Sequence, residues 1–141
     1  MGLKLQLVKD SKIIFEIPLT VEEWKMDKRR RLKRELEVVE REIEEFVRMF
    51  DAFSNENRIR MIAEIAKDPD YRMKFRDIKG QTKLNPKIVT EGLKKMMHAG
   101  LLDKEEKEYR IPPIGFGVFL ASCVALRKIM DALEWEYGEE F

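Results

Sequence analysis

The segment from Leu84 to Leu102, LNPKIVTEGLKKMMHAGLL, reads as a helix with both ends marked and one polar face. Asn85 suits the N-cap, Pro86 suits the first helical position, and Gly100 suits a left-handed C-cap. One face of this helix is apolar at helical spacing: Val89, Leu93 and Met96. The other face carries side chains that can bind phosphate oxygens or base edges: Lys87, Thr90, Glu91 and Lys94.

Residues suited to catalysis or metal binding are scarce. The single cysteine, Cys123, and the single histidine, His98, fall on different expected helices, and nothing completes a nucleophile and base pair. One Cys and one His cannot assemble a Cys/His zinc site. Gly115-Phe116-Gly117 lacks the rest of a glycine-rich phosphate loop. We therefore predict no enzyme activity, no catalytic residues, no metal and no cofactor.

Length and composition bound the class of protein. A chain of 141 residues accommodates one domain with appended elements. Charged residues make up 39% of the chain but nearly cancel at +1, and Lys, Arg and Glu outnumber Asn and Gln as in thermophilic, archaeal-type proteins. The lone cysteine suggests a reducing, cytoplasmic setting, and the longest uncharged run, Ile111 to Leu126, is shorter than a membrane span. We predict a cytoplasmic protein with no membrane segment.

The helices and strands expected on either side of the polar-faced helix follow one another in the order of a known fold. Ser54 is the expected cap of a helix with an apolar stripe at Ile59, Ile62 and Ile65, which Asp68-Pro69-Asp70 ends. A short helix around Phe75 and Ile78 then leads through Gln81-Thr82-Lys83 into the helix at Pro86, which predicts a helix-turn-helix. From Leu101 to Ile111 the pattern predicts a small hairpin with a charged tip. A helix-turn-helix followed by such a hairpin is a winged helix.

The N-terminal part of the chain predicts a hairpin and a long helix. Leu3, Leu5 and Leu7 alternate with Lys4 and Gln6, and Ile13, Phe15 and Ile17 alternate with Ile14 and Glu16, around a turn at residues 9–12. A two-stranded hairpin is only marginally stable alone, so its apolar face must pack against another part of the same chain or pair with a second copy. Thr20 with Glu23 matches a capping box, and Leu19 with Trp24 a hydrophobic staple, so a helix should begin at Val21.

Along this long helix the apolar residues follow heptad spacings and therefore form a seam: Leu32, Leu36, Val39, Ile43, Phe46, Phe50 and Phe53. The seam packs either against other helices of the same chain or across a dimer. Lys28 to Arg34 contains six basic residues in seven. This segment is either a solvated face offset by the following Glu residues or a contact with phosphates.

A final helix from Phe116 is apolar over more than one stripe, which predicts cover from its own domain and from a second subunit. The expected dimerisation residues are Phe119, Cys123, Leu126, Ile129, Met130 and Leu133. The predicted fold class is thus mainly α with small β-hairpins. We expect an N-terminal hairpin and long helix (1–53), a winged helix-turn-helix (54–112) and a C-terminal dimerisation helix (113–141).

Two stretches carry a resemblance to a known family. Phe50-x-x-Phe53-Ser54-Asn55-Glu56-x-Arg58-Ile59-Arg60-x-Ile62 is similar to the opening helix of the arsenical-repressor (ArsR-like) winged-helix regulators. Phe75-x-x-Ile78 with Leu84-Asn85-Pro86 and Ala99-Gly100-Leu101-Leu102 resembles their helix-turn-helix. The resemblance covers Phe50 to Ile111 and implies a homodimer whose outer helices pair and whose recognition helices enter the major groove of DNA.

The chain departs from that family in three places. The metal-sensing Cys-x-Cys is absent, so no metal response is implied. Glu91 and Gly92 stand where a long polar or basic residue is expected to face DNA, and Glu91 suits DNA only if it accepts from a cytosine amino group. The wing tip from Glu105 to Glu108 has three Glu and one Lys, which weakens a minor-groove role.

The leading hypothesis is a homodimeric, sequence-specific regulator that binds double-stranded DNA. From Ser54 to Pro112 there are 14 Lys or Arg and 10 Asp or Glu, a modest positive excess. In this hypothesis the residues on phosphates are Lys83, Asn85 and Lys87, those near base edges are Thr90, Glu91 and Lys94, and Lys95 adds to the basic patch. The alternative is a winged-helix module that binds protein, which the acidic wing and Glu91 favour. Target sequence, effector and direction of regulation are left open.

Overall fold

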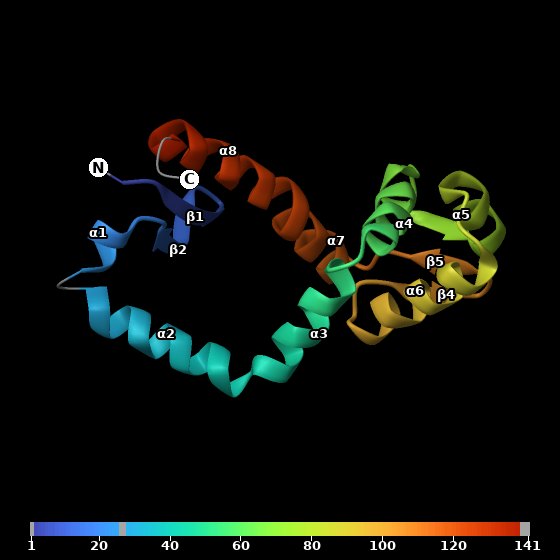
Figure 1. Cartoon of the computed structure of the whole chain (residues 1–141), viewed down its shortest axis with the longest axis horizontal. Coiled ribbons are helices and arrows are strands. Elements are labelled where there is room, and N and C mark those ends of the chain that lie inside the picture. The colour runs from blue at the N-terminus through green and yellow to red at the C-terminus, as the bar shows by residue number, and fades with distance from the viewer. Residues whose placement is uncertain (1, 26–27, 139–141) are drawn as a thin grey trace. The chain divides into compact units, whose positions relative to one another are not determined.

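The computed structural model describes residues 2–25 and 28–138 and divides the chain into two compact units, Met1–Ile43 and Glu44–Phe141. The structure is mainly helical with two small antiparallel sheets, as Figure 1 shows, so the predicted fold class is confirmed. The first unit holds a two-stranded hairpin and helix α2 (Arg29–Arg41). The second unit holds the winged helix and the C-terminal helices.

The N-terminal hairpin forms as predicted, from β1 (Lys4–Lys9) and β2 (Lys12–Pro18). Asp10 and Ser11 form its two-residue turn with φ of 50° and 66°, the pair of left-handed conformations that matches the twist of the strands. A register shift at Leu7/Val8 pairs Leu7 with Phe15 but Val8 with Ile13. The expected alternation of Ile13 with Phe15 and Ile17 is therefore wrong, because a β-bulge inserts one extra residue.

The prediction of a long N-terminal helix is correct about where the helix begins but wrong about its continuity. Helix α1 (Val21–Trp24) begins at the predicted residue, yet Thr20 makes no side-chain capping bond; instead the Trp24 indole Nε1 donates to the Pro18 carbonyl at 2.6 Å. Helix α2 ends at Arg41 and α3 (Ile43–Phe53) begins two residues later. Between them Glu42 has φ −106° and ψ 20°, and its N–H is shared between the carbonyls of Val38 and Val39. The heptad spacing of the apolar residues continues through Glu42 and therefore gives no sign of this break.

The winged helix comprises α4 (Glu56–Lys67), β3 (Arg72–Lys74), α5 (Phe75–Thr82), α6 (Pro86–His98), β4 (Asp103–Glu105) and β5 (Glu108–Arg110). Strand β5 pairs with both β3 and β4 in an antiparallel sheet. Strand β3 was not predicted, since three residues are too few to show an alternating pattern. The fully buried side chains come from all three helices and the turn after α6: Met61, Ile62, Ile65, Ile78, Val89, Leu93, Met96 and Leu101.

The cap of α4 differs from the prediction by one residue. Asn55 is the N-cap, and its Oδ1 accepts from the backbone N–H groups of Asn57 at 2.8 Å and Arg58 at 3.3 Å. Ser54 instead donates its hydroxyl to the Asp51 carbonyl at 2.8 Å. Both residue types cap helices well, so the sequence alone does not separate them.

The C-terminal helix consists of α7 (Pro113–Phe119), a π-helical turn η2 (Leu120–Ala125) and α8 (Leu126–Tyr137). Phe119 is buried and its ring stacks on that of Phe53, with centroids 6.4 Å apart. Leu126 and Met130 are exposed by 48% and 60%. A π-helical turn holds more residues than an α turn and so rotates the side chains that follow it. The apolar face of α8 is therefore turned away from the core that Phe119 occupies.

The same helix bears on the expectation of no membrane segment. The uncharged run ends at Leu126, but the helix from Pro113 to Tyr137 is 25 residues long and, by length and composition alone, long and apolar enough to cross a membrane. Length therefore does not exclude a span, contrary to the prediction. Core helices of soluble proteins pass the same test, yet only 11% of the apolar window is buried here. The described residues of its own unit leave most of this helix uncovered.

Two glycines of α7 provide a matched test of how tightly the helix packs. A Cβ at Gly115 would lie 2.3 Å from the Leu101 carbonyl oxygen, a backbone atom that cannot move aside, whereas a Cβ at Gly117 meets nothing within 4 Å. We predict that Gly115→Ala lowers the free energy of unfolding by about 1–3 kcal/mol through overpacking. Gly117→Ala should be neutral or stabilise by up to about 1 kcal/mol through helix propensity. Thermal denaturation of both variants checks this, and equal melting temperatures would contradict it.

Candidate nucleic-acid interface

The turn that sets the direction of α6 is held by one hydrogen bond within α5 and one from α4. The Thr82 hydroxyl donates to the Ile78 carbonyl at 2.7 Å, and the Arg60 guanidinium of α4 donates to the Thr82 carbonyl at 3.1 Å. Lys83 follows with φ 59°, the left-handed conformation that ends α5. The chain thus reverses at Lys83, whose side chain is exposed at the start of the turn.

Both ends of α6 are capped as the sequence predicts. The Asn85 Oδ1 accepts from the Ile88 N–H at 2.9 Å, and Pro86 occupies the first turn. At the other end Gly100 has φ 78°, its N–H donates to Met97, and the Leu101 N–H donates to Met96. These two bonds form a Schellman motif. The oxygen of Asn85 is therefore engaged in capping, and only its amide nitrogen is available to a partner.

The inner face of α6 packs closely on α4. Val89, Leu93 and Met96 are buried as predicted. Gly92 is buried as well, and a Cβ there would lie 2.1 Å from the Met61 Cε. The expectation that Gly92 stands on the face toward DNA is therefore wrong, because its missing side chain admits Met61 between the helices.

The outer face of α6 is polar and exposed. Lys87, Glu91, Lys94 and His98 recur at spacings of four, three and four residues, and all four are exposed. Such positions lie on one side of an α-helix. Thr90 and Lys95, also exposed, flank this stripe on its two sides. His98 was not among the predicted contacts, although its spacing from Lys87 and Lys94 places it with them.

Lys95 has a partner in α3. Its Nζ lies 3.0 Å from the Asp51 carboxylate, and both side chains are about half exposed. The hydrogen bond from Lys95, with a further contribution from the charges of Lys95 and Arg58, lowers the pKa of Asp51. Arg48, Lys94 and His98 line the same shallow hollow, so Asp51 is surrounded by cationic or ionisable side chains. Lys95 is thus less available to an outside anion than Lys87 or Lys94.

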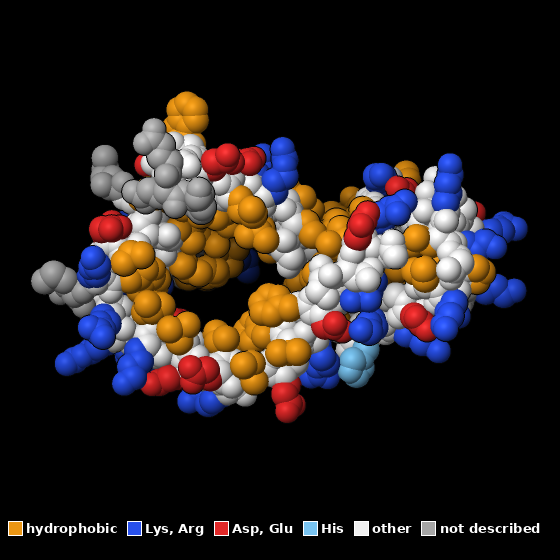
Figure 2. Space-filling model, in the orientation of Figure 1, with side chains coloured by type: hydrophobic (Ala, Val, Ile, Leu, Met, Phe, Trp, Pro, Cys, Tyr) orange, Lys and Arg blue, Asp and Glu red, His pale blue; other side chains and the backbone are white. Residues whose placement is uncertain are grey.

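Helix α5 adds further cations beside α6. Between Lys74 and Lys95 there are seven Lys or Arg residues and two acids. Lys74, Arg76 and Lys79 on or beside α5 are exposed, and Figure 2 shows Lys and Arg side chains gathered at this end of the winged helix. Arg76 lies 4.0 Å from Asp77 at the surface, a weak pair. These α5 residues were not predicted, because in the sequence only the polar face of α6 has the spacing that marks candidate contacts.

The wing differs from α5 and α6 in its electrostatics. Arg110 donates to Asp103 through two hydrogen bonds of 3.0 and 2.8 Å, and Glu105 lies 3.5 Å from Arg72 and 3.7 Å from Arg110. The bonds from Arg110, with its charge and that of Arg72, lower the pKa of Asp103. The arginines of this sheet are therefore already paired with carboxylates. The wing offers little positive charge to phosphate.

The predicted dimerisation residues divide into two groups. Phe119 is buried, and Cys123 packs against the core of its own unit, where burial raises the pKa of its thiol. Ile129 and Leu133 are half-buried, whereas Leu126 and Met130 are exposed. Nothing in the described residues arranges three or more His, Cys, Asp or Glu side chains to hold a metal ion.

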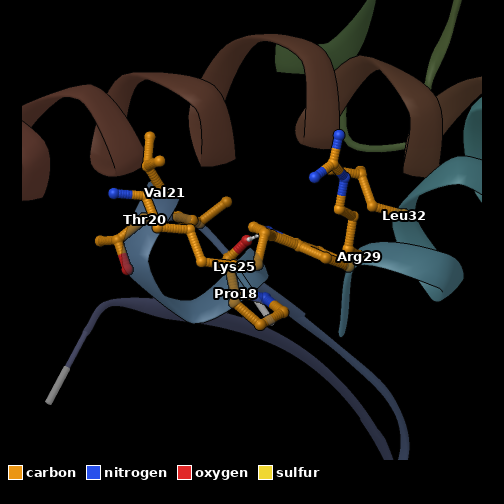
Figure 3. Close-up of a pocket in the computed structure, with 8 residues that line it drawn as sticks. Pro18, Thr20, Val21, Lys25, Arg29 and Leu32 are labelled. Atoms are coloured by element: carbon orange, nitrogen blue, oxygen red, sulfur yellow. Dashed lines mark hydrogen bonds between the residues drawn. The ribbon is translucent and has the colours of Figure 1, made fainter. Parts of the chain in front are cut away.

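A separate hollow lies in the first unit, where the end of β2 and helix α1 meet α2 (Figure 3). It has a volume of about 570 Å³ and is open on one side. Pro18, Val21 and Leu32 line it together with Trp24, and Lys25 and Arg29 supply its charges. A hollow of this kind suits an apolar molecule with a negative group.

Comparison with known proteins supports the fold. No protein-family model matches the chain, and no curated protein matches it. The chain is similar to the homodimeric winged helix-turn-helix DNA-binding domain of a possible ArsR-family transcriptional regulator from Mycobacterium bovis, with a TM-score of 0.53 and 18% identity over 67% of this chain and 85% of that one. It is also similar to a MarR family transcriptional regulator from Streptomyces coelicolor, with a TM-score of 0.50 and 17% identity over 85% of this chain and 82% of that one. At these identities the likeness establishes the winged-helix fold.

The Asp51–Lys95 pair generates a pH prediction. Because the folded-state pKa of Asp51 lies below its ordinary value of about 3.9, the pair stabilises the protein above that pH and loses its contribution as the pH falls through the folded pKa. Lys95→Met should raise the pKa of Asp51 toward the ordinary value. Lys94→Met, which removes an equal charge next door, should leave it nearly unchanged. A carboxyl-detected NMR titration measures both, and an equal response would show that no direct bond exists.

Proposed function

We propose that the protein is a sequence-specific regulator of transcription that binds double-stranded DNA as a homodimer. The observation that carries this proposal is the outer face of α6, where Lys87, Thr90 and Lys94 are exposed on a helix whose opposite face is locked into the core. A capped helix of this length fits the major groove. The exposed lysines of α5 extend the positive surface beside it.

The side chains divide by role in this proposal. Lys83, Lys87 and the amide of Asn85 lie near the start of α6 and contact phosphates, which set the register of the helix on DNA. Thr90, Glu91 and Lys94 face base edges, with Glu91 accepting from a cytosine amino group. Lys95 contributes to the local field while it holds Asp51. Gly92 makes no contact with DNA, since it is buried.

The dimer in this proposal is formed by the C-terminal helix. Leu126 and Met130 of α8 are exposed, and Ile129 and Leu133 beside them are half-buried. A second copy of the helix would cover these residues and leave the two α6 helices to read two half-sites. Phe119 and Cys123 support α8 from within their own chain.

The proposal also includes the family of the protein and its location in the cell. The signature around Phe50 to Ile62 and the fold likeness to a possible ArsR-family regulator support an ArsR-like relationship. The MarR-type likeness has a lower TM-score but covers more of this chain. A cytoplasmic location agrees with the single, partly buried cysteine.

One observation favours a second function, binding to a protein partner. The wing carries Asp103, Glu105, Glu106 and Glu108, and its arginine is paired with Asp103. An acidic wing would repel a phosphate backbone but would suit a basic protein surface. The two functions differ in how affinity for duplex DNA depends on salt.

The DNA proposal predicts distinct effects for three lysines. A duplex pool of random sequence, roughly 30 base pairs long so that two half-sites one turn apart fit, is selected for binding and then titrated over a salt series. Lys87→Ala should reduce the slope of log K against log salt by about 0.9 for each phosphate that the variant no longer neutralises, and Lys94→Ala should do the same if Lys94 also reaches phosphate. Lys107→Ala, in the acidic wing, should change the slope little.

The same measurement discriminates between the two functions. A parent protein that binds no duplex at roughly 50 mM salt would reject the regulator and favour a protein partner. Glu91→Ala should change which sequences are selected while the salt slope stays constant. A uniform loss of affinity in Glu91→Ala would mean that Glu91 supports the helix instead of reading a base.

The dimer proposal predicts opposite outcomes for two residues of the C-terminal helix. Met130→Glu should leave the fold intact, because Met130 is exposed in one chain, but should weaken self-association. Phe119→Ala should lower the free energy of unfolding by about 3–5 kcal/mol, because Phe119 packs in its own core. Sedimentation and circular dichroism separate the two effects. A monomeric parent at micromolar concentration, or recovery of the parent only with membranes, would refute this dimer.

A further inference from the structure

The hollow of about 570 Å³ in the first unit is formed by three neighbouring elements of that unit: the end of β2, helix α1 and the start of α2. In Figure 3, Arg29 and Leu32 of α2 lie on one side of it, and Pro18, Val21 and Lys25 lie across from them. Most of these side chains are apolar and two are cations. An apolar wall with a few charged groups is the usual form of a site for a small molecule.

The indole of Trp24 is a part of this wall that two contacts hold in place. Its Nε1 donates to the Pro18 carbonyl at 2.6 Å. The Arg31 guanidinium carbon lies 5.5 Å from the centroid of the ring, and Arg31 itself donates to the Glu16 carbonyl of β2 at 2.5 Å. A ring that is fixed before a ligand arrives loses little conformational freedom on binding, which favours affinity.

Positive charge is in excess around the hollow. Residues 25–34 contain seven Lys or Arg and one acid, Asp27, which lies outside the described residues. No acid is among the described residues that line the hollow. The ion pairs of this unit involve other side chains, so neither Lys25 nor Arg29 has a carboxylate partner within the described part of the unit. The charge of this hollow is therefore complementary to an anion.

The neighbouring surface of α2 limits the size of that anion. A second open hollow begins at Arg29 and Leu32 and continues along α2 to Glu37 and Glu40. These two carboxylates would repel negative charge placed beyond Leu32. A long polyanion would meet both of them, whereas a compact molecule would not. Charge therefore favours a small ligand whose single anionic group lies at Arg29 and Lys25.

We propose that this hollow binds a compact monocarboxylate, a molecule with one carboxylate group and an apolar body. The Arg29 guanidinium is a planar fork that can donate two parallel hydrogen bonds to a carboxylate, and Lys25 adds a second positive charge. The apolar body packs on the Trp24 indole and removes from water the side chain of Val21, which is 68% exposed. The site lies in the first unit, so this proposal goes beyond the DNA proposal and does not rest on it.

The test uses two probes of the same shape, adamantane-1-carboxylate and its neutral amide, adamantane-1-carboxamide. The chain has two tryptophans, and Trp135 is 89% exposed. In the full-length Trp135→Phe protein, tryptophan fluorescence therefore reports on Trp24 alone, and calorimetry measures the same dissociation constants. The carboxylate should bind about tenfold more tightly than the amide, because a charge-assisted hydrogen bond to Arg29 contributes about that factor.

Three variants separate the charge from the apolar wall. Arg29→Met keeps an apolar stem and should raise the dissociation constant of the carboxylate about tenfold while that of the amide stays within about twofold. Arg34→Met removes the same charge from the same helix but lines neither hollow, so it should change neither constant by more than about twofold. Val21→Ser should weaken both probes about threefold, because Val21 supplies apolar contact and no charge. Circular dichroism verifies the fold of each variant.

Three outcomes would overturn the proposal. Equal affinity of the parent for the two probes would show that Arg29 and Lys25 do not hold an anion. Equal losses in Arg29→Met and Arg34→Met would assign the effect to the general field of the basic segment. No binding of the carboxylate at about 10 mM, where even a weak site for a small molecule is occupied, would show that the hollow is not a site. Because none of these measurements involves α6 or duplex DNA, the inference can fail while the DNA proposal stands.

Discussion

The close approach of α4 and α6 at Gly92 is the constraint on which the rest of the winged helix depends. With no side chain at Gly92, the Met61 side chain packs directly against α6, and both residues are buried. The inner stripe of α6 is then fixed in the core, and by the geometry of the helix the polar stripe from Lys87 to His98 must face outward. A larger residue at position 92 would push the helices apart or rotate α6, and the exposed lysines would change direction with it.

Electrostatics then restricts where this unit can meet an anion. Arg110 and Arg72 are paired with Asp103 and Glu105, so the sheet that forms the wing offers little unpaired positive charge despite its arginines. Lys95 is held by Asp51. In contrast, the exposed cations of α5 and of the outer face of α6 are mostly without such strong partners among the described residues. Positive surface is therefore concentrated on the helix-turn-helix, which is why the proposed DNA contacts rest on helices and not on the wing.

Apolar surface is distributed in the opposite way. The winged helix buries its large apolar side chains, whereas α2, α3 and α8 expose Leu36, Ile43, Leu126 and Met130. Soluble chains rarely leave such contiguous surface open to water. The π-helical turn η2 is what directs the apolar face of α8 outward, and the break at Glu42 separates the seam of α2 from that of α3. In the proposed dimer, a second copy of α8 would cover Leu126 and Met130.

The sequence by itself determined the elements whose signals are local. Asn85, Pro86 and Gly100 specify the ends of α6 through their own side chains and backbone preferences, and the spacing of Val89, Leu93 and Met96 specifies its inner face. The order of helix, turn, helix and hairpin was readable for the same reason. The exposure of the proposed contact residues at positions 87, 90, 91 and 94 followed from that periodicity, since a residue opposite the core must be exposed.

Tertiary structure decided what depends on neighbours distant in the chain. Strand β3 exists only because β5 pairs with it, and Gly92 is buried only because Met61 packs there. Likewise, Asp51 engages Lys95 forty-four residues away, which no pattern of spacing reveals. The bulge at Ile14, the break at Glu42 and the π-helical turn were missed for a further reason. Each shifts the register of the side chains by a fraction of a turn or by one residue, whereas a periodic pattern assumes an unbroken element. Local chemistry thus determined the start and end of α6, and packing determined which of its polar side chains remain available.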